Sequence, residues 1–71
     1  MHVRIDRPEL LVDLCDFLSR EGLIAVGADA QTANVLVPQA QTDLDAELLV
    51  RAKVRAWQDL HPDVSLAVGD D

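Results

Sequence analysis

The first five residues alternate between apolar and polar side chains. Val3 and Ile5 take one side of the chain, and His2 and Arg4 take the other. A period of two is typical of a β-strand with one buried face. The pattern therefore predicts a short strand over residues 1–5.

A helical stripe follows this strand. Asp6 is predicted to cap the helix, with Glu9 three residues later as its capping-box partner. Pro8 suits the first turn, where N–H groups have no intrahelical acceptor. Gly22 predicts a left-handed residue just after the helix. The apolar stripe consists of Leu10, Leu11, Leu14, Phe17 and Leu18.

Two short apolar runs come next, at residues 23–29 and 34–38. They predict a hairpin, although the AQTA between them lacks the Asn-Gly or Asp-Gly signal of a tight turn. In the second run Val35 and Val37 face inward, and Pro38 closes the strand because it has no N–H to donate.

The register of the first run is ambiguous, because Leu23 and Ile24 are both large. We expect Ile24 and Val26 to point inward and Leu23 and Ala25 to point outward. A shift of one residue would exchange the two sets.

The longest predicted element is a helix over residues 43–60. Thr42 is its expected N-cap, with Asp45 three residues later. Acidic residues gather in its first turns and basic residues come later, as the helix dipole favours. His61 and Pro62 mark the end, and His61 there is a favourable cation.

This helix carries two apolar stripes. The expected core stripe contains Leu49, Ala52, Ala56 and Leu60, and the second contains Val50, Val54 and Trp57, with Lys53 between the two. A helix on a sheet needs only one stripe. Two interpretations stay open. Trp57 leans over the sheet edge or the first helix while Lys53 reaches outward, or the second stripe is a partner surface, since Trp is enriched at interface hot spots.

A last strand over residues 64–68 completes the order strand, helix, strand, strand, helix, strand. This order predicts an α+β ferredoxin-like βαββαβ plait, a four-stranded antiparallel sheet with two helices on one face. Residues 1–71 form a single domain in which 69–71 are expected to fray. The expected core, beside Ile24 and Val26, is Val3, Ile5, Leu10, Leu14, Phe17, Leu18, Val35, Val37, Leu49, Ala56, Leu60, Leu66 and Val68.

The sheet face without helices is expected to carry few large side chains: His2, Arg4, Ala25, Leu36, Ser65 and Ala67. It has no aromatic ring for base stacking, which argues against RNA binding. Small side chains let another sheet or helix approach, so this face is a candidate dimer surface.

Charge and length narrow the choice of partners. Thirteen acidic and six basic residues give a net charge of −7, which disfavours nucleic-acid binding. A chain of 71 residues has a small core, and self-association is a common supplement. Cys15 is the only cysteine, and neither a signal peptide nor a membrane span is apparent, so we expect a cytoplasmic protein.

No catalytic, cofactor or metal site can be assembled from the pattern. The histidines, His2 and His61, are far apart, and the paired carboxylates fall on exposed helix faces. Cys15 lies in mid-helix, where a buried, inert thiol is expected. We therefore expect a protein that is not an enzyme.

The stretch VRIDRPELLVDLCDFLSREGLIAV, residues 3–26, resembles the first half of an ACT domain. That family opens with a strand, Asp-Arg-Pro-Gly-Leu-Leu, a helix with a leucine stripe, and a glycine before an Ile-rich strand. The positions that match are Asp6, Arg7, Pro8, Leu10, Leu11 and Gly22. The resemblance implies a regulatory βαββαβ module that pairs by its sheets or helices and often binds an amino acid.

The same resemblance implies a ligand at the mouth of the first helix, beside Asp6, Arg7 and Glu9. In the family, glycine replaces Glu9 and lets a ligand approach the free N–H groups there. In this chain the Glu9 carboxylate occupies that approach.

Three functions remain open. The first is a non-catalytic interaction module, a homodimer or a subunit with a protein partner, through Val50, Val54, Trp57, Arg4, Ala25, Leu36 and Ala67. The second is an ACT-like sensor of a small molecule. The third is an acidic inhibitor or nucleic-acid mimic for a basic partner, which requires one surface shared by Asp13, Asp16, Asp43, Asp45 and Glu47.

Overall fold

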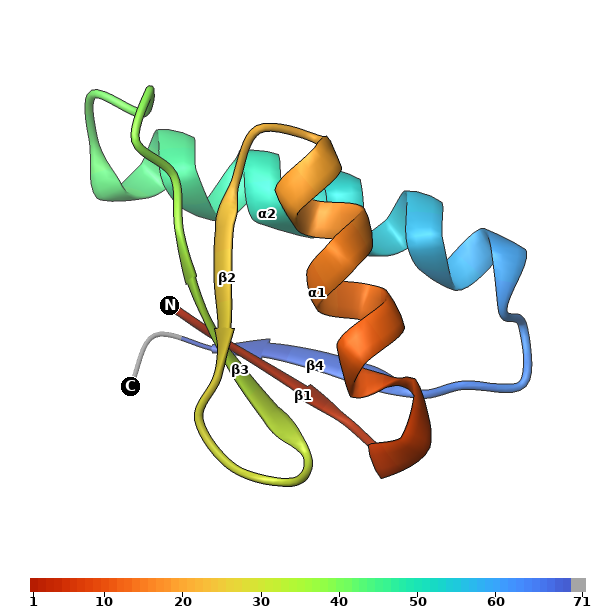
Figure 1. Cartoon of the computed structure of the whole chain (residues 1–71). Coiled ribbons are helices and arrows are strands. Elements are labelled where there is room, and N and C mark those ends of the chain that lie inside the picture. Colours follow the sequence, from red (N-terminus) through yellow and green to blue (C-terminus); the bar gives the residue numbers. More distant parts are fainter. Residues whose placement is uncertain (70–71) are drawn as a thin grey trace.

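Four strands and two helices follow one another in the order βαββαβ in the computed structural model, which describes residues 1–69 (Figure 1). The sheet order is β2-β3-β1-β4, with antiparallel neighbours, and both helices cover one face. This is the predicted two-layer plait. The elements are β1 (His2–Ile5), a 3₁₀ turn η1 (Pro8–Leu10), α1 (Leu11–Arg20), β2 (Ile24–Gly27), β3 (Thr32–Leu36), α2 (Asp43–Leu60) and β4 (Leu66–Gly69).

The central strand β1 fixes the inner layer of the sheet. Val3 lies opposite Ala33 of β3 on one side and Val68 of β4 on the other. Val3 and Ile5 are fully buried, as their alternation predicts. Of the expected tail, Gly69 belongs to β4, while residues 70–71 lie outside the described part of the chain.

The start of α1 differs from the prediction. No side chain caps η1 or α1, so the capping box of Asp6 and Glu9 is wrong. The Asp6 carboxylate instead accepts the backbone N–H of Ser65 at 3.0 Å, which ties the end of β1 to the start of β4. A partner distant in sequence has replaced the local one, and the 3₁₀ turn with Pro8 begins the helix without a cap.

The end of α1 is as predicted. Gly22 has φ +89°, in the left-handed region. Its N–H donates to the Ser19 carbonyl, and the Leu23 N–H donates to the Leu18 carbonyl at 3.1 Å. This pair of bonds is a Schellman motif, in which the residue after the glycine packs back on the helix.

That motif explains why the predicted register of β2 is wrong. Leu23 is 3% exposed, since it packs back toward the buried Leu18, whereas Ile24 is 47% and Val26 59% exposed. With Leu23 inside, strict alternation turns Ala25 inward and sends Ile24 and Val26 to the open face.

The start and end of α2 are confirmed. The Thr42 hydroxyl accepts the Asp45 N–H at 3.1 Å, and the helix ends at Leu60, where His61 is the C-cap. The Nζ of Lys53 reaches Glu21 at 2.9 Å, just beyond the end of α1.

The predicted buried side of α2 is wrong. Val50, Val54 and Trp57 are at most 4% exposed and enter the core, whereas Leu60 is 71% exposed. Ala56 is also exposed, and Leu49 is half-buried at the margin. Trp57 determines this orientation, because it offers the largest apolar surface and its indole N–H finds an acceptor in Asp13 of α1.

The core is otherwise close to the expected one. Val3, Ile5, Leu14, Leu18 and Val35 are buried, and half-buried residues packed around them include Leu10, Phe17, Val37, Leu66 and Val68. Buried residues that the pattern did not predict as core are Leu11, Leu23, Ala33, Val50, Val54, Trp57 and Val64.

Candidate functional site

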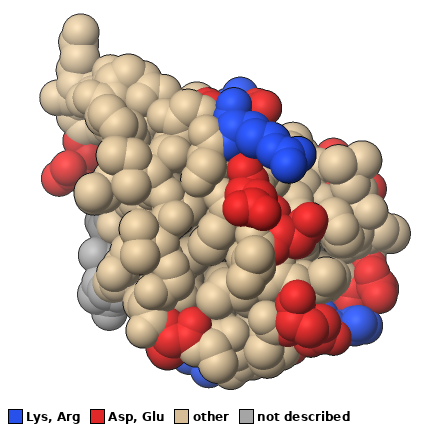
Figure 2. All heavy atoms as spheres, in the orientation of Figure 1, with Lys and Arg blue, Asp and Glu red and all other residues tan. Residues whose placement is uncertain are grey.

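Charged side chains are distributed over the surface in several groups. Figure 2 shows, on one face, separate acidic groups, some with a basic side chain beside them. Two of the acids named above already have partners, because Asp13 accepts the indole N–H of Trp57 and Glu47 pairs with Arg51 at 3.1 Å. The Arg51 guanidinium offsets the charge of Glu47, whereas Asp13 keeps its charge because the indole N–H is neutral.

The open face of the sheet carries an exposed apolar patch at its β2 side. Ile24 lies opposite Leu36 in the β2–β3 ladder, and Val26 is two residues further along the same face of β2. Leu36 is 61% exposed, and Ile24 and Val26 are exposed as described above. We call Ile24, Val26 and Leu36 the open-face patch. Contiguous exposed apolar side chains of this kind are typical of interaction sites.

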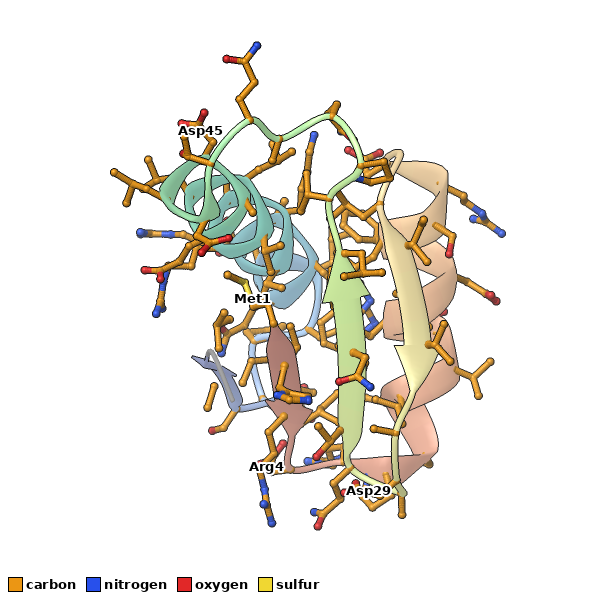
Figure 3. All side chains as sticks on the ribbon, turned by 90° about the vertical axis from the view of Figure 1, so that its left-hand side faces the viewer. Met1, Arg4, Asp29 and Asp45 are labelled. Atoms are coloured by element: carbon orange, nitrogen blue, oxygen red, sulfur yellow. The ribbon has the colours of Figure 1, made fainter. Side chains whose placement is uncertain are left out.

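The other half of the open face is hollowed and carries charged and polar side chains among small apolar ones. A hollow of about 460 Å³ is lined by His2, Arg4, Thr32, Ala67 and neighbouring residues. Arg4 and Asp29 lie at the same end of this face (Figure 3). The backbone N–H of Gln31 lowers the pKa of Asp29 from its ordinary value, with a smaller contribution from the charge of Arg4. Asp29 is therefore anionic at neutral pH.

The candidate interface residues fall into two groups. Arg4, Leu36 and Ala67 lie exposed on the open face, as expected. Ala25 turns inward, and the second helical stripe, Val50, Val54 and Trp57, lies in the core, so these four offer no surface to a partner. The pattern missed Ile24 and Val26. The signal was present in Gly22, because a left-handed helix end favours burial of the next apolar residue.

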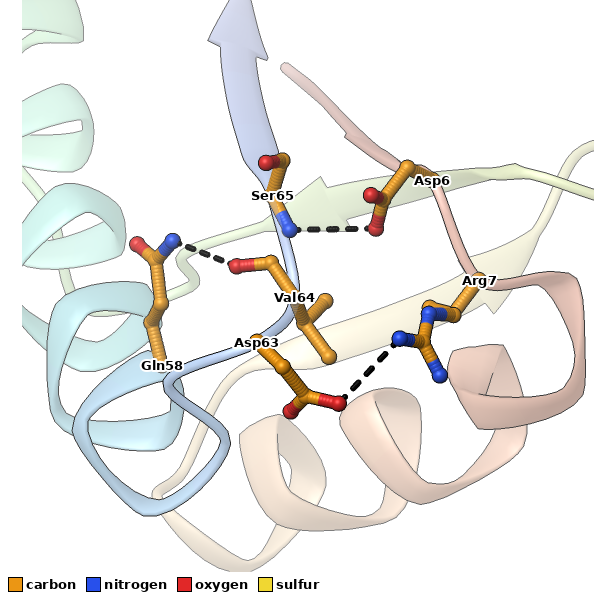
Figure 4. Close-up of polar contacts among 6 residues, drawn as sticks. All are labelled: Asp6, Arg7, Gln58, Asp63, Val64 and Ser65. Carbon is orange, nitrogen blue, oxygen red and sulfur yellow. Dashed lines mark hydrogen bonds and ion pairs between the residues drawn. The ribbon is translucent and has the colours of Figure 1, made fainter.

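The candidate ligand mouth has a structural role (Figure 4). Besides the bond from Asp6 to Ser65, the Arg7 guanidinium pairs with Asp63 at 3.1 Å, and the Gln58 amide donates to the Val64 carbonyl at 2.7 Å. Asp6 and Arg7 thus hold the connection from α2 to β4. Glu9 is exposed and takes no part in these contacts.

A small polar cluster joins the two helices. Trp57 donates its indole N–H to Asp13 at 3.0 Å, and the His61 ring stacks on the Trp57 ring with centroids 4.0 Å apart. The Nε2 of His61 is 3.8 Å from the same Asp13 carboxylate. Asp13 therefore connects α1 to the end of α2.

Within residues 1–69, no group of three or more His, Cys, Asp or Glu side chains is placed to hold a metal ion.

Cys15 is half-buried on α1. Burial raises the pKa of its thiol above the ordinary value, and the neighbouring Asp16 charge raises it further. The thiolate that a nucleophile or metal ligand requires is disfavoured at neutral pH.

The comparisons with known proteins add no relatives. No family model, curated protein or solved structure matches the chain. Among the described residues, neither helix combines the length and apolar character needed to cross a bilayer.

Proposed function

We propose that this chain is a non-catalytic interaction module that pairs with a second copy of itself through the open face of its sheet. The open-face patch carries this proposal. Ile24, Val26 and Leu36 present adjoining apolar side chains on a face that no helix covers.

A second copy is the occupant that the small core favours. A domain of 71 residues buries a limited share of its apolar surface, and pairing two patches would bury more. In a two-fold dimer the same patch serves both partners, so one apolar cluster is sufficient. At the β4 side of the same face, the small side chain of Ala67 lets a second sheet approach to about 10 Å, the usual spacing of packed sheets.

Sedimentation equilibrium over a range of concentrations tests this function. We expect the native chain to dimerise and Leu36→Asp to weaken dimerisation at least tenfold, about 1.4 kcal/mol. Leu60→Asp is the matched control, because Leu60 is 71% exposed at the end of α2. A native chain that stays monomeric up to about 1 mM, a concentration that corresponds to about −4 kcal/mol, would contradict the proposal. Dissociation by Leu60→Asp alone would contradict it as well.

A small-molecule sensor is the second candidate, supported by the ACT resemblance and by the hollow beside Arg4 and Asp29. The opposite charges of these two side chains suit a ligand with both a carboxylate and an amine. Thermal unfolding with each amino acid tests it, because a ligand at 100 times its Kd adds about 2.7 kcal/mol to stability. The absence of any shift would rule out binding at those concentrations.

A further inference from the structure

A second uncovered region lies on the far side of the sheet from the open-face patch, between α2 and β4. A groove of about 780 Å³ runs there. The α2 wall includes Arg51, Arg55, Gln58 and Asp59, and the β4 wall includes Leu66 and Val68. We call this hollow the α2–β4 groove.

The backbone of β4 is turned toward this groove at alternate residues. The Asp6 N–H donates to the Ser65 carbonyl at 3.2 Å, and the β1–β4 register continues from that pair to Ala67 opposite Arg4. Hydrogen-bonded and non-bonded pairs alternate in an antiparallel ladder. The N–H and C=O groups of Leu66 and Val68 therefore point away from β1, toward the free edge.

One contact confirms this direction. The Nη2 atom of Arg51 lies 3.4 Å from the Val68 carbonyl oxygen and donates to it from outside the sheet. That carbonyl already accepts a hydrogen bond across the groove. A backbone N–H of an added strand would be an equivalent donor.

β4 is a short edge strand, but its own residues include none of the side chains that block strand addition. The sequence of β4 is Leu-Ala-Val-Gly, with neither a charged residue nor a proline. Natural sheets blunt exposed edges with such residues or cover them. In residues 1–69 no other strand pairs with this side of β4.

The arginines indicate what chemistry the added strand carries. Arg55 is exposed and has no carboxylate within 4.0 Å among residues 1–69, whereas Arg51 is held by Glu47. Alternate side chains of an added strand would point to the α2 side, where Arg55 lies. Among the described residues that line the groove, Asp59 carries the only carboxylate, so the two arginines leave the lining net positive. Physiological salt screens the negative charges of the chain that lie more than about 8 Å away.

We propose that the α2–β4 groove binds an extended peptide segment of a partner protein as a fifth strand, with an acidic side chain of that segment paired to Arg55. Backbone bonds to Leu66 and Val68 supply affinity, and the arginine supplies selectivity, as in other strand-addition complexes. Pairing of two copies through the open-face patch leaves this edge free, so the inference does not depend on the proposed function.

The probe is a short acetylated and amidated peptide in which valine and glutamate alternate. It is titrated into the ¹⁵N-labelled native chain at neutral pH and low concentration. We expect saturable shifts of the Leu66 and Val68 amides, and slower hydrogen exchange at both, because each gains a backbone partner. Shifts confined to β2, or none anywhere, would overturn the proposal.

Two matched pairs separate strand addition from simple charge attraction. Arg55→Glu should weaken peptide binding about tenfold. Arg20→Glu, the same charge change on α1, should leave binding within about twofold. A peptide N-methylated at alternate residues should lose binding, since it cannot complete the ladder, and so should a peptide with lysine in place of glutamate. Equal binding by the lysine peptide, or equal loss in both arginine variants, would overturn the proposal.

A second copy of this chain is the competing occupant. Pairing of two β4 edges would slow exchange at Leu66 and Val68 as protein concentration rises, with no peptide present. Such protection, unaffected by Leu36→Asp, would assign the groove to self-association and overturn the peptide proposal. Its absence, together with peptide-dependent protection, supports the proposal.

Discussion

The two helices cover the same face of the sheet, but they acquire their buried sides in different ways. In α1, Leu14 and Leu18 are fully buried and charged residues occupy the opposite side. Only one orientation of this helix buries its leucines. In α2, apolar residues extend over both flanks, so two orientations fit the sequence about equally well.

Tertiary contacts decide between the two orientations of α2. The selected side contains Trp57, which buries about 150–250 Å² as a Trp typically does. Its indole N–H donates to Asp13 of α1, so the one polar atom of the side chain is satisfied as well. The rejected side leaves Leu60 exposed. The helical period of the apolar residues identifies α2 as a helix. Because two apolar stripes compete, the period does not determine which side of the helix faces the core.

The largest expected effect tests this choice directly. Trp57→Ala should cost about 3–5 kcal/mol, because it leaves a cavity in the core. A domain of this size has little more than that to lose, so the variant should be largely unfolded at 25 °C. Leu60→Ala, on the rejected side of the same helix, should change stability by less than about 0.5 kcal/mol. Urea unfolding followed by far-UV circular dichroism measures both, and equal losses would contradict the assigned orientation.

The end of α1 supplies the second test. Gly22→Ala forces a side chain into a left-handed conformation and should cost about 1–2 kcal/mol. The space itself is open, because an added Cβ lies no closer than 3.8 Å to the Gln39 side chain, so the loss is conformational. Gly27→Ala in β2 is the control. Its Cβ would lie 3.9 Å from Leu11 and its φ is not positive, so stability should hold or rise by about 0.5 kcal/mol. Similar losses in both variants would mean that backbone conformation is not the cause.

The fold was predictable because its signals are local. Alternation in β1, the Gly22 helix end and the Thr42 cap each depend on a few neighbouring residues. The β2 register was mispredicted because Leu23 and Ile24 are similar in size, although the helix end at Gly22 favours burial of Leu23. The rotation of α2 was not predictable, because it depends on a contact with a residue distant in sequence. The capping box failed for the same reason, since Asp6 binds Ser65 instead.

The candidate interface residues were likewise predicted correctly only where the local pattern is unambiguous. Arg4, Leu36 and Ala67 were placed correctly on the open face, because alternation in β1, β3 and β4 is unambiguous. Ile24 and Val26 were misplaced together, because a register error moves every residue of a strand. No pattern in the sequence predicts the α2–β4 groove. The groove depends on the distance between α2 and β4, which is set by the packing of the whole fold.

Substitutions at the starts of the two helices should have a smaller effect on the free energy of unfolding. Thr42→Ala should cost about 1 kcal/mol, because the Asp45 N–H loses its side-chain acceptor at the start of α2. Glu9→Ala, in the 3₁₀ turn before α1, should change stability by less than about 0.3 kcal/mol, since no side chain caps that start. Both values come from urea unfolding of otherwise native chains. A loss at Glu9 as large as at Thr42 would restore the capping box that the structure replaces.

The smallest effect concerns Cys15 at the margin of the α1 stripe. Its pKa is raised above the ordinary thiol value, first by burial and then by Asp16, so the folded chain holds the neutral thiol more firmly than the unfolded chain does. This contribution to stability is therefore fully present below the unfolded-state pKa of the thiol, and it is lost as the pH rises through the higher folded-state pKa. Iodoacetamide should alkylate Cys15 more slowly in the native chain than in urea at the same pH, because alkylation requires the thiolate.

Asp16→Asn removes the lesser of the two causes of the raised pKa and should move the pH dependence of alkylation slightly toward lower pH. Asp59→Asn, an equal charge change on α2, should leave that dependence in place. If Asp59→Asn moved it as far as Asp16→Asn, the shift would reflect net charge rather than the neighbour of Cys15 on its own helix.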